Sequence, residues 1–78
     1  PYRNYGKSEE RFLKAIENDP AYINSYYELA LLYQVWKKKD LAAQYFRKVL
    51  ELEIQTDFVV QGQESKEKAK KWLEDNGY

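Results

Sequence analysis

The sequence contains no cysteine, no histidine and no methionine among its 78 residues, and it has only three glycines and two prolines. Without cysteine the chain can form neither disulfides nor thiolate metal sites. Without histidine it lacks the commonest general base and metal ligand. These absences exclude most catalytic and metal chemistry, so we expect a protein that is not an enzyme and that holds no cofactor or metal.

The chain also lacks an excess of charge of either sign, because 13 Lys and Arg residues balance 13 Asp and Glu residues. No global positive potential favours nucleic acid or an anionic membrane, and we expect neither as a partner. No apolar run is long enough to cross a bilayer, and no secretory leader opens the chain. We therefore expect a soluble protein without membrane insertion. Its compartment stays open, with the cytoplasm slightly favoured, and a first residue other than methionine suggests a fragment of a longer protein.

What the chain does have is an unusual share of aromatic residues, 17%, in a length that allows one small domain. Together with the few backbone breakers, this composition is typical of helices with bulky packing residues. Apolar residues recur at intervals of three and four, which predicts helices. The sequence Asn18-Asp19-Pro20 marks the firmest boundary between two of them, because proline restricts the residue before it and favours a first helical turn.

We expect four helices, over residues 8–18, 21–36, 41–53 and from about 58 to the Asn76-Gly77 stop. Ser8, Asp40, and either Thr56 or Asp57 are the expected caps of the first, third and fourth. A later start of the fourth helix, near Ser65, remains open because Gly62 inside a helix costs about 1 kcal/mol relative to alanine.

The sequence is also similar to itself at a spacing of 34 residues, which is informative because a fixed period changes the expected fold. Laying residues 1–20 over residues 35–54 aligns three identical pairs: Phe12 with Phe46, Lys14 with Lys48, and Glu17 with Glu51.

The segment Tyr26-x-x-Leu29-Ala30-x-x-Tyr33, followed by Ala42-x-x-x-Phe46, resembles the tetratricopeptide repeat in residue type and spacing. Pro20 stands where the preceding unit would close, whereas Lys37 and Ile54 replace the usual glycine and proline. The resemblance implies an all-α fold of antiparallel helix pairs in a right-handed superhelix, with about one and a half repeats and a C-terminal capping helix. Residues 1–20 would then be the second half of a repeat, 21–54 a complete repeat and 55–78 the cap.

The resemblance further implies a non-catalytic protein–protein interaction module whose concave groove receives a peptide or a helix of a partner protein. The groove residues that it implies are Asn24, Tyr27, Glu28, Leu31 and Gln34. Tyr27 and Leu31 lie off the core stripe, and packing against the last helix accounts for them as well as contact with a partner does. If Tyr27 is a partner anchor, its change to alanine should leave thermal stability nearly unchanged. Glu28 disfavours capture of an acidic chaperone tail.

A second hypothesis gives the chain a structural role. The first helix lacks the helix that the repeat pattern places before it, so we expect an exposed edge at Phe12, Leu13 and Ile16. This edge would join a second copy, giving a homo-oligomer, or would dock on the rest of its own chain. The lysine clusters at residues 37–39 and 66–71 are expected to be solvated, because acidic residues intersperse the second cluster. The tyrosines mostly follow the core stripe, which argues against base stacking.

Overall fold

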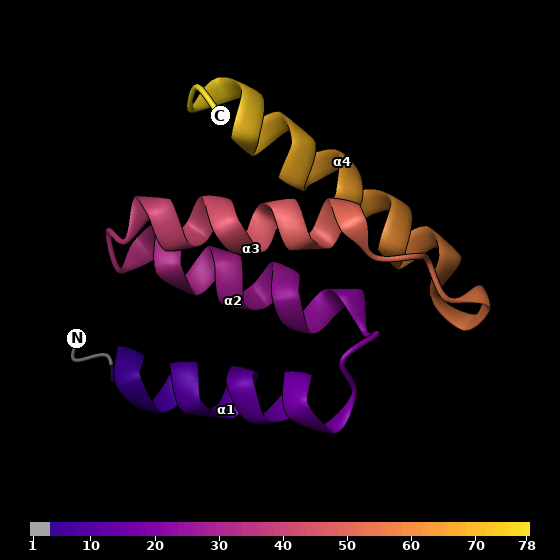
Figure 1. The fold of residues 1–78 in the computed structure, drawn as a ribbon, viewed down its shortest axis with the longest axis horizontal. Helices are drawn as coiled ribbons and strands as arrows, with labels where there is room; N and C mark the ends of the chain where they lie inside the picture. Colours follow the sequence, from indigo (N-terminus) through magenta and orange to yellow (C-terminus); the bar gives the residue numbers. More distant parts are fainter. Residues whose placement is uncertain (1–3) are drawn as a thin grey trace.

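The computed structural model describes residues 4–78, which form four α-helices and one short 3₁₀-helix (Figure 1). The elements are α1 (Tyr5–Asn18), α2 (Ile23–Val35), α3 (Lys39–Glu51), η1 (Thr56–Phe58) and α4 (Val59–Asp75). Residues 4–78 contain no strand. The predicted all-α fold is therefore confirmed, and the four expected helices are all present.

The helices are arranged in chain order, so that each packs on the one before it (Figure 1). α2 and α3 form the most extensive pair, α1 packs closely on α2, and α4 packs on α3 and also on α2. α2 therefore has neighbours on three sides, which is why its sequence is apolar nearly all round. None of the helices in the described part of the chain combines the length and the apolar character that crossing a membrane requires.

The core lies between α2, α3 and α4, and α1 contributes no fully buried residue to it. Large side chains alternate there with small ones, which lets neighbouring helices approach closely. The buried apolar residues are Ile23, Tyr26, Leu29, Ala30, Leu32, Tyr33, Ala42, Ala43, Phe46, Val49, Ala69 and Leu73. α1 is attached at the edge of this core through half-buried residues such as Phe12 and Ile16.

Gly62 explains how α4 is seated on the end of α3. A Cβ atom at this position would lie 2.8 Å from Cγ2 of Ile54, closer than packed atoms allow, so only glycine fits without displacing Ile54. The loss of helix propensity at Gly62 is outweighed by this close approach, and α4 runs unbroken from Val59. The expectation of a continuous last helix is confirmed, and the alternative start near Ser65 is wrong.

The helix starts differ from the expected caps. Asn4 caps α1, because its Oδ1 accepts a hydrogen bond of 3.0 Å from the Lys7 N–H, so Ser8 lies inside the helix and is not its cap. Asp40 lies in the first turn of α3, where its carboxylate accepts a 2.8 Å hydrogen bond from the Tyr78 hydroxyl. Thr56 and Asp57 form part of η1, and no side chain caps α4.

Two helices end in the same backbone motif but with different residues. At the end of α4, Gly77 has a φ of 80° and the Tyr78 N–H donates to the Leu73 carbonyl at 2.8 Å. At the end of α2, Lys37 has a φ of 64° and the Lys38 N–H donates to the Tyr33 carbonyl at 2.8 Å. Both ends are Schellman motifs, which favour glycine at the left-handed position. The Asn76-Gly77 stop is confirmed, and Lys37 adopts a conformation that glycine would adopt without strain.

Candidate partner-binding face of the second helix

One side of α2 carries the five residues that the sequence assigned to a groove. Asn24, Tyr27, Glu28, Leu31 and Gln34 follow one another at spacings of three, one, three and three, which places them on a single helical face. The structure thus brings them together on one element. Their environments differ along the helix, because α4 lies beside the start of α2.

The N-terminal part of this face is partly covered by the start of α4. Tyr22 packs edge-to-face on Phe58, with ring centroids 5.2 Å apart, and its hydroxyl donates to Oε1 of Gln61 at 3.4 Å. Asn24 is half-buried and lines a small hollow together with these side chains and Gly62. This contact fixes α4 relative to the inner face of α2.

Tyr27 is half-buried and packs on the core. Its ring lies 6.1 Å from that of Phe46 at an interplanar angle of 62°, and the Phe46 ring lies 4.7 Å from that of Trp72. Removal of the Tyr27 side chain would leave the fully buried Phe46 without one of its neighbours. We therefore expect Tyr27→Ala to lower thermal stability, in contrast to the expectation from sequence, and a change at Tyr27 cannot test partner binding alone.

Asn24 and Glu28 form a pair on this face. The Asn24 Nδ2 donates a hydrogen bond of 2.8 Å to Oε1 of Glu28, one helical turn away. The pair fixes the orientation of the Asn24 amide and leaves Glu28 exposed with its negative charge. The face therefore presents an anionic group beside its apolar residues.

The C-terminal part of the face is open. Leu31 is 37% exposed and Val35 is 47% exposed, with the exposed Gln34 between them on the helix surface. Aliphatic side chains exposed on the same face of a helix give a partner apolar area to bury. Val35 lies four residues after Leu31 and so continues the same face of α2.

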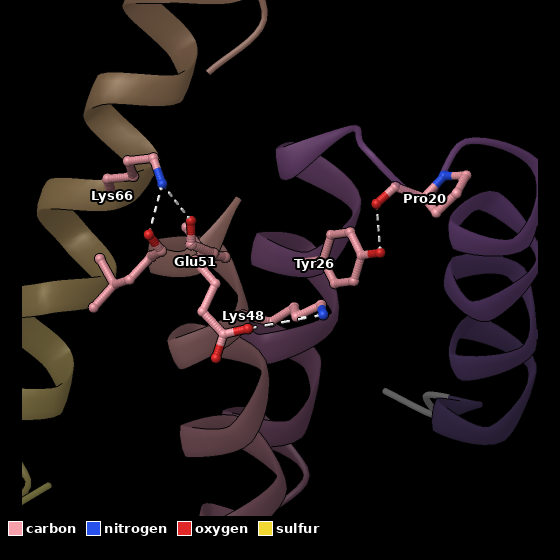
Figure 2. A network of polar contacts seen from close by, with 7 residues as sticks. Pro20, Tyr26, Lys48, Glu51 and Lys66 are labelled. Carbon is pink, nitrogen blue, oxygen red and sulfur yellow. Dashed lines mark hydrogen bonds and ion pairs between the residues drawn. The ribbon is translucent and has the colours of Figure 1, made fainter. Parts of the chain in front are cut away.

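The opposite face of α2 packs on α1. The Tyr33 hydroxyl donates to Oε2 of Glu9 at 2.6 Å, and Trp36 packs on Tyr5 with ring centroids 5.5 Å apart. Burial is the main cause that raises the pKa of Tyr33 above its ordinary value of 10.0, and the bond to Glu9 raises it further. Burial, followed by the neighbouring Tyr45, also raises the pKa of Tyr26. The Tyr26 hydroxyl donates to the Pro20 carbonyl at 2.6 Å, which holds the turn between α1 and α2 (Figure 2).

The residues of the self-association hypothesis lie on α1. Phe12 and Ile16 are half-buried against the core, whereas Leu13 is 41% exposed. Two of the three apolar side chains are therefore already in contact with their own chain. The edge of α1 exposes less apolar surface than its sequence suggested.

Lys66 is the structurally important residue that sequence reasoning missed. It reaches from α4 to the last turn of α3 (Figure 2). There its ammonium donates to the carbonyls of Val49 at 2.8 Å, Leu50 at 2.9 Å and Leu52. Burial lowers the pKa of Lys66, whereas the carbonyl acceptors favour its charged form. The expectation that this lysine is solvated is wrong. The available signal was its place beside the small residues Ser65 and Ala69, which the sequence put on the packed face of α4.

Within residues 4–78, no group of three or more acidic side chains is arranged to hold a metal ion. Two ion pairs each join residues about one helical turn apart on the surface: Lys48 with Glu51 at 3.8 Å (Figure 2), and Lys71 with Asp75 at 3.2 Å. Exposed pairs of this kind contribute little to stability.

Comparison with known proteins finds a match between residues 12–48 and the family model described as tetratricopeptide repeat. Residues 12–48, just under half of the chain, are similar to a tetratricopeptide repeat. The repeat match covers the second half of α1, all of α2 and most of α3, and it includes the aromatic and small residues that carried the resemblance. No curated protein and no solved structure gives a significant match to the chain.

Tetratricopeptide repeats generally mediate protein–protein interaction and are typically non-catalytic. Arrays of such repeats bind their partners on the extended concave surfaces that stacking creates. The family therefore accounts for an all-helical chain whose neighbouring helices bury each other. The face that a partner would use in this protein has to be argued from its own residues.

Proposed function

We propose that this protein is a non-catalytic interaction module that binds a peptide or a helix of a partner protein along the inner face of α2. Leu31 and Val35 supply the apolar contact, and Gln34 with the Asn24–Glu28 pair orients the bound segment through hydrogen bonds. Burial of aliphatic surface gives most of the affinity in such contacts, while polar groups at the rim give orientation.

One observation carries this proposal: the face changes from half-buried to exposed along a single helix. Asn24 and Tyr27 are half-buried beside α4 and the core, whereas Leu31 is 37% and Val35 47% exposed. The covered part holds α4 in place and the open part is free to contact a partner. The exposed Glu28 favours a partner with a neutral or basic segment next to its apolar residues.

The partner class can be tested with a phage-displayed library of random 16-residue peptides selected on the purified protein. Enriched peptides should bind the wild-type chain and should bind Leu31→Ser at least tenfold more weakly, since a buried leucine side chain contributes roughly 2 kcal/mol. Amide chemical-shift changes in the wild-type protein should centre on residues 24–35. Isothermal titration gives the affinities.

Leu13→Ser is the matched control, because Leu13 is exposed to a similar extent, 41% against 37% for Leu31, but lies on α1. Its unfolding curve and its peptide affinity should both match those of the wild type. Peptides that bind wild type and Leu31→Ser with equal affinity, or whose shift changes centre on α1, would exclude the α2 face as the binding site. Growth of the particle size with concentration, abolished by Leu13→Ser, would instead favour the self-association hypothesis.

A further inference from the structure

A second exposed apolar surface lies at the start of α4, away from the open half of α2. Phe58, Val59 and Val60 are consecutive in the chain and are 45%, 43% and 70% exposed. They belong to the segment that projects from the bundle where α3 ends (Figure 1). Of the large apolar side chains exposed in residues 4–78, these are the ones that follow each other directly in the sequence.

Acidic residues lie next to this apolar segment. Asp19, Glu53 and Asp57 line a shallow hollow between the α1–α2 turn and the α3–α4 linker, and Phe58 forms part of its wall. A neighbouring hollow shares Asp57 and Phe58 and adds Val59 and Val60. No lysine or arginine lines either hollow. The two hollows share Asp57 and Phe58 and so form one surface that carries both apolar and acidic side chains.

None of the three carboxylates forms an ion pair with a lysine or arginine of residues 4–78. In residues 4–78, the ion pairs within 4.0 Å are those of Lys48 with Glu51 and of Lys71 with Asp75. Lys66, which lies on the neighbouring turn of α4, uses its ammonium for the carbonyls at the end of α3. Within the part of the chain that the structure describes, Asp19, Glu53 and Asp57 therefore take part in no ion pair within 4.0 Å.

We propose that the linker patch, defined as Asp19, Glu53, Asp57, Phe58, Val59 and Val60, binds a segment of a partner protein in which aliphatic residues are flanked by lysine or arginine. The aliphatic residues cover Phe58, Val59 and Val60, and the basic groups pair with the three carboxylates. The patch adjoins the covered end of the α2 face, where Phe58 and Asn24 line the same small hollow, but neither Leu31 nor Val35 lines its two hollows. The patch and the open half of α2 can therefore each bind without the other.

Charge complementarity selects this occupant over others. A second copy joined patch to patch would set the acidic groups of both chains against each other, which is unfavourable. Nucleic acid and anionic membranes would be repelled for the same reason. A basic, apolar segment removes apolar area from water and adds opposite charges at the rim. Because the rim is exposed, its contribution should fall as salt is raised.

Three synthetic 14-residue peptides titrated into the ¹⁵N-labelled protein test the proposal: one of leucine and lysine, one of leucine and glutamate, and one of serine and lysine. The leucine–lysine peptide should shift the amides of residues 53–61, and the other two should bind at least tenfold more weakly. Raising the salt concentration from 0.05 to about 0.5 M should weaken the leucine–lysine complex several-fold.

Two variants separate the apolar and the charged parts of the linker patch. Val60→Ser should weaken the leucine–lysine peptide about fivefold at any salt concentration, because it removes exposed apolar area without disturbing the core. The double change Glu53→Gln with Asp57→Asn should weaken binding at low salt and abolish most of the salt dependence. Val35→Ser, on the open half of α2, is the matched control and should leave this affinity unchanged.

Several results would overturn the proposal. Equal binding of the leucine–glutamate peptide would show that charge does not select the occupant. Shift changes centred on residues 24–35 would place the peptide on the α2 face. If the amide shifts of residues 53–61 changed with protein concentration in the absence of peptide, a second copy of the chain would be covering the patch. If Leu31→Ser loses the library peptides but still binds the leucine–lysine peptide at the linker patch, the inference stands. If the library peptides bind the α2 face as proposed but the leucine–lysine peptide does not bind the patch, this inference fails and the proposed function does not.

Discussion

α1 and α3 occupy the same position in the 34-residue period, yet their environments differ. Phe12 of α1 and Phe46 of α3 are the same residue in the same place of the repeat. Phe46 is 1% exposed and packs between Tyr27 and Trp72, whereas Phe12 is only half-buried on the surface of α2. α3 is covered by α2 and α4, while α1 is in close contact with α2 alone.

This difference shows that a repeat position does not determine burial by itself. In a stacked array each helix pair contacts its neighbours, so the number of neighbours sets how much apolar area an identical residue removes from water. Consequently the two ends of the array have different requirements. At the C-terminal end, α4 has a polar outer face and packs closely on Ile54 at Gly62. It also supplies Lys66, which binds the carbonyls at the end of α3. α1 relies on a few half-buried side chains and on the Tyr33–Glu9 hydrogen bond.

The largest expected effect comes from exchanging the two equivalent phenylalanines for alanine. Phe46→Ala should lower the free energy of unfolding by about 3–5 kcal/mol, the usual range for a fully buried phenylalanine. Phe12→Ala should cost roughly half as much, because its ring keeps part of its exposure in the folded state. Urea unfolding followed by circular dichroism measures both.

Phe46→Leu provides a milder change if Phe46→Ala does not fold, since it keeps most of the side-chain volume. It should still cost more than Phe12→Leu does. Equal losses at both positions would contradict the comparison and would mean that α1 is buried in solution by something that covers it, a second copy included.

The sequence predicted the parts of the fold that depend on local pattern. Spacing predicted the four helices, and the Asn76-Gly77 stop has the expected positive φ at Gly77. The size and spacing of Tyr26, Leu29 and Ala30 matched the repeat, and these residues form the core. The five groove residues fall on one face of α2, but their partner role remains a prediction.

What the sequence could not predict depends on contacts between distant segments. Lys66 resembles the other lysines of α4 in sequence, and only the packing of α4 brings it to the carbonyls at residues 49–52. From the sequence, Gly62 only lowers helix propensity. The reason for a glycine at this position is the packing of Ile54 against it, which leaves no room for a Cβ atom. Asp40 had the sequence features of a cap, but its actual partner, Tyr78, is 38 residues away.

Lys66 sharpens the comparison of the two equivalent helices, because the end of α1 has no basic residue in its last turn and no such cap. Lys66→Met keeps the aliphatic stem but removes the donor to three carbonyls. We expect it to lower the free energy of unfolding by about 1–2 kcal/mol, since those carbonyls lose a charged donor and must be hydrated instead.

Lys68→Met, at an exposed position two residues further along α4, is the control and should change stability little. Hydrogen exchange locates the effect: the amides of the last turn of α3 and the first turns of α4 should exchange faster in Lys66→Met, and those of α1 should not. Faster exchange throughout the molecule would argue against a local capping role.

The smallest effect concerns the attachment of α1 through Tyr33. Tyr33→Phe removes the donor to Glu9 and should cost about 1 kcal/mol near neutral pH.

The raised pKa of Tyr33 also makes stability depend on pH, because the folded state keeps the phenol proton that the unfolded state loses above pH 10. The stabilisation is therefore complete below pH 10 and is lost as pH rises above it, by up to about 1.4 kcal/mol per pH unit for this group. Urea unfolding between pH 8 and 11 should show a shallower decline in Tyr33→Phe than in wild type. Tyr22→Phe, which removes a phenol that packs beside α4, is the control. An unchanged slope in Tyr33→Phe would mean that the Tyr33 phenol is neither buried nor bonded to Glu9 in solution.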